Sequence, residues 1–109
     1  MAADERLLER VRSALGRRSV SEKRMFGGVA FLLRGHMCVG VLGSTLVVRV
    51  DKDKSDALLA PPHVRPMDFT GRPMRGFLYV DGPAIRTAAA LKKWVDRAVA
   101  YASALPPKK

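Results

Sequence analysis

The sequence contains little cysteine, no long apolar run and no leading basic segment. Its single cysteine, Cys38, cannot form an internal disulfide, which is typical of proteins in a reducing compartment. The longest apolar runs, at residues 29–33 and 38–42, fall far short of the ~20 residues that a bilayer crossing needs. The chain starts with acidic residues instead of the basic and then apolar segments of a secretion signal. These absences predict a cytoplasmic protein.

Acidic residues are also few compared with basic ones. Ten Asp and Glu stand against 20 Lys and Arg, so the formal net charge is +10. A positive field of this size attracts polyanions and speeds their encounter, which favours nucleic acid or an acidic protein as a partner over a cationic ligand. The alternative interpretation is a solvated surface that only keeps the protein soluble.

Apolar residues are plentiful, by contrast, at 48% of the 109 residues. This share is typical of globular proteins and unlike that of disordered chains. A chain of this length has room for one cooperative core. We therefore expect one domain over residues 1–109, ordered from about residue 5 to residue 104 with a frayed tail at 105–109.

Apolar residues at helical spacing predict a helix near each end of the chain. Residues 4–16 carry an apolar stripe that begins at Leu7 and ends at Leu15, and Gly16 supplies a stop. Thr87 is the expected N-cap of the second helix, and Trp94 and Tyr101 provide most of that helix's buryable area.

The middle of the chain changes to short apolar runs divided by glycine turns, which predicts strands. Strands at 28–33, 36–42 and 45–50 are close enough in sequence to form an antiparallel meander. A short helix within 51–60 and two further strands at 67–69 and 76–80 follow, and Gly27-Gly28 marks a bulge or sharp bend. The order α, β, β, β, α, β, β, α predicts a two-layer α+β domain with an antiparallel sheet and its helices on one side.

One segment of the chain carries a resemblance to a known family. Arg24-Met25-Phe26-Gly27-Gly28, followed by Phe31 and the hairpin at residues 34–37, resembles the hallmark of the TfoX N-terminal domain. In that family a Met-Phe-Gly-Gly segment opens a meander of strands. Residues 65–69 with Gly71-Arg72, and residues 91–95 with Ala98, are similar to its fourth strand and closing helix.

The resemblance implies a fold of the secretion-chaperone type, a homodimer and a non-enzymatic role. In full-length TfoX (Sxy) regulators this domain helps to switch on DNA-uptake genes together with the cyclic-AMP receptor protein. Those regulators also carry a C-terminal helical domain, for which 109 residues leave no room. We therefore expect a stand-alone regulatory or protein-interaction module.

The sequence offers no convincing catalytic or cofactor site. His36 and Cys38 would share one side of a strand, but structural zinc normally takes four ligands, and a buried, inert Cys38 is the better interpretation. A cysteine nucleophile would need a base held close to it. Gly27-Gly28 lacks the Lys-Ser/Thr of a phosphate-binding loop. We predict no enzyme, metal or cofactor.

Two groups of basic residues are the candidate contacts for a partner or for phosphates. They bracket the first loop and the fourth-strand region, and comprise Arg17, Arg18, Lys23, Arg65, Arg72 and Arg75. Arginine suits planar carboxylate or phosphate recognition. Aromatic residues are only 6% of the chain, and Phe31 and Phe77 alternate as core residues would, so the pattern does not favour a base-stacking platform. The leading hypothesis is protein interaction, and the alternative is weakly specific nucleic-acid binding.

Overall fold

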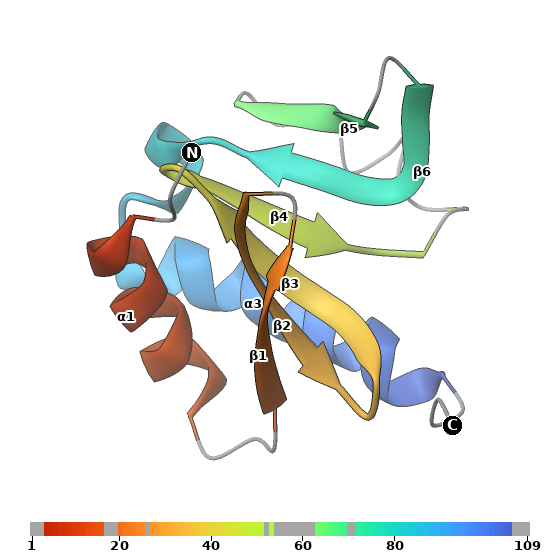
Figure 1. The fold of residues 1–109 in the computed structure, drawn as a ribbon. Helices are drawn as coiled ribbons and strands as arrows, with labels where there is room; N and C mark the ends of the chain where they lie inside the picture. Colours follow the sequence, from red (N-terminus) through yellow and green to blue (C-terminus); the bar gives the residue numbers. More distant parts are fainter. Residues whose placement is uncertain are drawn as a thin grey trace.

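The described part of the chain folds into one antiparallel sheet, two α-helices and a short 3-10 helix, as Figure 1 shows. The computed structural model describes residues 4–16, 20–25, 27–51, 53, 63–69 and 72–105, with the backbone alone at residues 25, 66–69 and 72–75. In chain order the elements are α1 (Glu5–Leu15), β1 (Val20–Met25), β2 (Gly28–Leu33), β3 (His36–Leu42), β4 (Thr45–Arg49), β5 (Val64–Phe69), β6 (Arg72–Val80), the short 3-10 helix η2 (Gly82–Ile85) and α3 (Ala88–Ala104).

The six strands form one sheet in the order β1-β2-β3-β4-β6-β5. All neighbouring strands are antiparallel, and β1 to β4 follow one another as a meander. Arg34 and Gly35 connect β2 to β3 with φ values of 55° and 85°, the positive pair that a two-residue type I′ turn requires. The predicted antiparallel meander is thus confirmed.

Both helices begin and end close to where the sequence predicts. The Asp4 carboxylate caps α1 by accepting hydrogen bonds from the backbone N–H groups of Arg6 and Leu7. The Thr87 hydroxyl accepts from the N–H of Ala90 at 3.1 Å and caps α3, as expected. Among the described residues, no helix is both long and apolar enough to cross a bilayer.

The helices lie on the same face of the sheet, which confirms the two-layer α+β prediction. In Figure 1, α3 runs behind the sheet and α1 lies beside it. The main core fills the space between them and combines Val11 of α1, Trp94 and Val95 of α3, and inward side chains of the strands. The sheet contributes Phe31, Leu33, Cys38, Val39, Val41, Leu46, Val48, Val64, Leu78 and Val80.

The opposite face of the sheet carries a second, smaller apolar cluster. Ala30, Met37 and Val47 are buried there, and Leu32, Leu42, Phe77 and Tyr79 pack against them with partial exposure. Among the described residues, neither helix contributes a side chain to this cluster. We call this side of the sheet the open face. Phe77, which alternates in the sequence as a core residue would, is half-buried and packs against this second cluster on the open face, beside its register partner Arg49.

Strand β1 is an addition to the predicted fold. Its exposed middle, from Ser21 to Arg24, is polar and shows no apolar alternation, because an edge strand packs against only one neighbour. Gly27 lies in the turn between β1 and β2 with φ 77°, and Gly28 is the first residue of β2, paired with Met25. The expected sharp bend is therefore a hairpin turn.

A β-bulge lies at Cys38 instead. Phe31 pairs with Val39 and Leu32 pairs with Met37, so Cys38 is the extra residue of β3. Cys38 and Val39 consequently both enter the main core. The short helix predicted within 51–60 falls on residues that, apart from Asp51 and Asp53, are outside the described part.

Strands β5 and β6 are longer than predicted, and each contains a proline. Pro66 lies in β5, which is an edge strand, next to a shift in register. Pro73 lies in the part of β6 that pairs with β5 alone, since β4 meets β6 only from Phe77 onward. At both positions the strand has a neighbour on one side only. A proline, which has no backbone N–H to donate, is therefore tolerated there.

Candidate interaction surface

The basic residues predicted as contacts lie at opposite edges of the sheet. Lys23 and Arg24 belong to edge strand β1, and Arg65 belongs to edge strand β5. Five strand spacings of ~4.8 Å separate these edges, which is roughly 24 Å across a flat sheet. The structure therefore does not join Lys23 and Arg65 into one cluster. Arg17, Arg18 and the side chains of Arg72 and Arg75 lie outside the described part.

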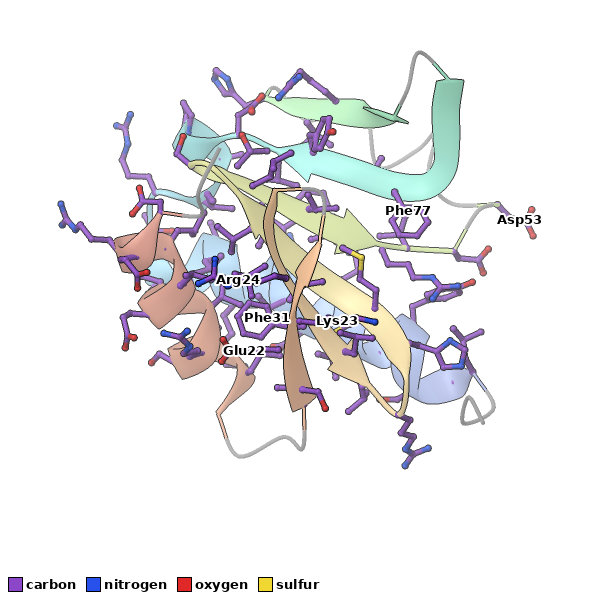
Figure 2. All side chains as sticks on the ribbon, in the orientation of Figure 1. Glu22, Lys23, Arg24, Phe31, Asp53 and Phe77 are labelled. Atoms are coloured by element: carbon purple, nitrogen blue, oxygen red, sulfur yellow. The ribbon has the colours of Figure 1, made fainter. Side chains whose placement is uncertain are left out.

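Lys23 and Arg24 are both exposed but face different surfaces. Lys23 pairs with Ala30, whose side chain belongs to the open face, whereas Arg24 pairs with Val29, which packs against the main core. Figure 2 shows Arg24 on the side of α1 and Lys23 on the other side of β1. Only Lys23 of the two can act on the open face.

Arg24 lines a shallow depression between α1 and β1. The depression encloses about 290 Å³ and is lined by Glu5, Leu8, Arg12, Glu22, Lys23, Arg24 and Val29. Arg12 donates from Nε and Nη2 to the two Glu22 oxygens, each at 2.9 Å, and from Nη1 to Glu9 at 2.6 Å. The Arg12 hydrogen bonds lower the pKa of Glu22, which is therefore ionised at neutral pH. These groups tie β1 to α1 and are not poised for acid catalysis.

Arg65 is fixed at the opposite edge by Asp81. Its Nε and Nη2 donate to the Asp81 carboxylate at 2.7 and 2.8 Å, and Thr45 donates to the same carboxylate at 3.1 Å. The hydrogen bonds from Arg65, then those from Thr45, outweigh burial and lower the pKa of Asp81. The guanidinium also lies 5.0 Å from the centroid of the Tyr79 ring. This cluster joins β4, β5 and β6 and orients Arg65 along the open face.

Arg49 is a further cation at this face that the sequence did not single out. Its guanidinium carbon lies 5.6 Å from the Phe77 ring centroid and 5.7 Å from that of Tyr101 on α3. Alternation along β6 could have predicted the side on which its aromatic residues lie. Leu78 and Val80 have the pattern of core residues, so Phe77 and Tyr79 must lie on the opposite face. Such contacts orient an arginine without neutralising it.

Three cations among the described side chains lie on the open face. They are Lys23, Arg49 and Arg65, and Arg65 pairs with the Asp81 carboxylate. Asp53 is exposed past the end of β4 and extends away from the sheet in Figure 2. The open face therefore combines an apolar centre with a positive margin.

The Met-Phe-Gly-Gly segment has a structural role at its glycines. A Cβ built on Gly28 would lie 2.1 Å from the backbone oxygen of Val41, so no side chain fits there. The side chain of Met25 and all of Phe26 lie outside the described part.

Cys38 is also structural. It is fully buried, and its thiol donates to the carbonyl of Phe31 at 3.3 Å. In the part of the chain that the structure describes, no three His, Cys, Asp or Glu side chains are grouped for a metal ion.

Comparison with known proteins gives one match. The family model described as TfoX N-terminal domain matches residues 9–102. No curated protein and no solved structure matches the chain. The match spans the larger part of α1, all six strands and nearly the whole of α3, so it covers the sheet, the glycine turn and most of both helices together. The chain belongs to the TfoX N-terminal domain family.

Proposed function

We propose that this domain is a cytoplasmic, non-enzymatic regulatory module that acts by binding another protein, as in TfoX-type regulators of DNA competence. The observation that carries the proposal is the open face, where half-buried Leu32, Leu42, Phe77 and Tyr79 lie among cations. Apolar patches bounded by polar groups are typical of interaction sites. Family membership supports the regulatory role, and the buried, reduced Cys38 fits a cytoplasmic location.

The ionisable groups support binding over catalysis. The shifts of Glu22 and Asp81 both lower the pKa of a carboxyl group that already pairs with an arginine. A general acid or base instead needs a pKa moved toward the working pH.

An affinity pull-down from the native cell, with and without nuclease, tests this function. A partner that remains bound to the tagged domain after nuclease treatment is the expected result. Loss of every partner on nuclease treatment would instead indicate bridging by nucleic acid.

Weakly specific nucleic-acid binding is the second candidate, favoured by the net charge of +10. If several Arg and Lys contact phosphates together, release of counterions makes the affinity fall steeply as salt rises. We expect DNA binding only at low ionic strength. Micromolar binding at about 0.15 M salt, with a preference for one duplex sequence, would overturn the choice of a protein partner.

A further inference from the structure

We infer that the open face docks an acidic amphipathic helix of a partner protein. The inference rests on the proposed function and adds the surface and the chemistry of the partner. The docked helix would lie across β2, β3, β4 and β6, opposite α3, and would complete a third layer on the sheet.

The first argument concerns the apolar centre of this face. Leu32, Met37, Leu42, Phe77 and Tyr79 come from three strands, and all of them except the buried Met37 keep part of their surface exposed next to Ala30 and Val47. On the other face of the same sheet, equivalent positions are covered by α3. An amphipathic helix can cover a surface of this kind. Its apolar side chains form a stripe along the helix, and a helix that crosses the strands lays this stripe over several of them.

The second argument is charge. Lys23 lies at the β1 side of the open face and Arg49 at its β4 end, while the carboxylate of Asp81 is taken by Arg65. A helix with carboxylates beside its apolar stripe would meet these cations, whereas a basic helix would be repelled. A second copy docked through the same face would bring this positive margin against itself, and repulsion between the two margins disfavours that arrangement.

The third argument separates a helix from nucleic acid. Base stacking needs aromatic ring faces that are free. Here the Arg65 guanidinium lies 5.0 Å from the Tyr79 centroid and that of Arg49 lies 5.6 Å from the Phe77 centroid, so each ring already has a cation over it. The remaining surface is aliphatic, which suits leucine side chains better than sugars and phosphates.

A labelled peptide of about five helical turns, ~18 residues, provides the probe. It carries leucines on one helical side and glutamates on the other, and a matched peptide has lysines in place of the glutamates. Fluorescence anisotropy at about 0.15 M salt measures both affinities. We expect the glutamate peptide to bind at least roughly tenfold more tightly than the lysine peptide.

The paired substitution Lys23→Glu and Arg49→Glu tests the margin of the open face. We expect it to weaken binding of the glutamate peptide roughly tenfold or more. The control pair Arg86→Glu and Lys93→Glu makes the same change of charge at exposed positions before and on α3, and should change the affinity less than about twofold. Thermal melting of each variant shows whether it is folded.

Methyl NMR locates the peptide in the unmodified protein and does not depend on any variant. On titration, the methyl signals of Leu32, Met37 and Leu42 should shift, while those of Leu8 and Leu91 in the helices should not. Shifts confined to the helices, or equal binding by both variant pairs, would overturn the inference.

Two other occupants are distinguishable outcomes. Open-face shifts produced by oligothymidine at the same salt would make it a nucleic-acid surface, and the same shifts on concentrating the protein alone would assign it to a second copy. Either result overturns the inference. A separate outcome is a partner protein that stays bound after nuclease treatment and binds the Lys23→Glu, Arg49→Glu variant with unchanged affinity. That result would support the proposed function and contradict only the assignment of the open face as its binding site.

Discussion

At the scale of single residues, Gly28 is a position where no side chain fits. Its missing side chain leaves room for the Val41 carbonyl, which would be 2.1 Å from a Cβ. Because that contact is with backbone, Gly28→Ala should lower the free energy of unfolding by about 3 kcal/mol. The matched control is Gly82→Ala, where nothing lies within 4 Å. Urea denaturation of both variants measures the difference, and equal stabilities would contradict the close approach.

Asp81 gives the domain a predictable response to acid. Its pKa is lower in the folded protein than in the unfolded chain, so the unfolded state binds the proton first and stability falls as pH falls below about 4. Arg65 is half exposed, with 55% of its side chain accessible, so the ion pair contributes only about 1 kcal/mol above that pH. Asp81→Asn should lower stability at neutral pH and flatten the acid dependence below about pH 4.

Thermal melting of Asp81→Asn across this pH range provides the measurement. Asp53→Asn serves as the control, because that carboxylate is exposed beyond β4. An unchanged acid profile in Asp81→Asn would show that another carboxylate sets the response.

At the scale of elements, the sequence predicted the regular pieces and missed those that depend on distant neighbours. The end of α1 and the start of α3 followed from Gly16 and Thr87, which act within one helical turn. Strand β1 was missed because its polar side chains bury little, and pairing with β2 holds it in place. The bulge at Cys38 depends on the register between β2 and β3, which single-strand alternation does not report.

The candidate site was less predictable than the fold. The sequence placed Lys23 and Arg65 in two basic groups, but their separation depends on the order of strands in the sheet. Arg49 acquires its aromatic neighbours Phe77 and Tyr101 only when β4, β6 and α3 are assembled. Contacts of this kind come from topology and have no local signature.

Trp94 is expected to anchor α3. Only 7% of its surface is exposed, and it belongs to the main core with Val95 and Ala98. Trp94→Ala should therefore cost ~3 to 5 kcal/mol of unfolding free energy. Lys93→Ala changes the neighbouring exposed position and should remain within about 0.5 kcal/mol of the parent. Indole fluorescence typical of full water exposure in the folded parent protein would argue against this anchor.

At the scale of the whole molecule, we propose a homodimer that forms along the free edge of β1. The resemblance to the TfoX family suggests a dimer, and β1 is an edge strand with a neighbour on one side only. Pairing two such edges would satisfy backbone groups that otherwise face solvent, and it would leave the open face available.

Light scattering at micromolar concentration should give twice the 11.9 kDa mass of the chain. Hydrogen exchange at Ser21 to Arg24 should slow as the protein is concentrated. A mass of one chain at these concentrations would contradict the dimer, and a dimer without slower exchange there would place the contact elsewhere.

The contact of α1 with the segment that leads into α3 predicts an order in which the molecule assembles. Arg10 of α1 donates hydrogen bonds to the carbonyls of Ile85, Arg86 and Thr87, which follow it in the sequence by 75 to 77 residues. Closing so long a loop costs more entropy than closing the short turns between β1 and β4, so the meander should form first on the refolding pathway. Leu91 is a buried residue of α3 in the main core. Leu91→Ala should then accelerate unfolding and leave the refolding rate nearly unchanged in stopped-flow measurements. Slower refolding in that variant would instead put the meeting of the two helices within the folding nucleus.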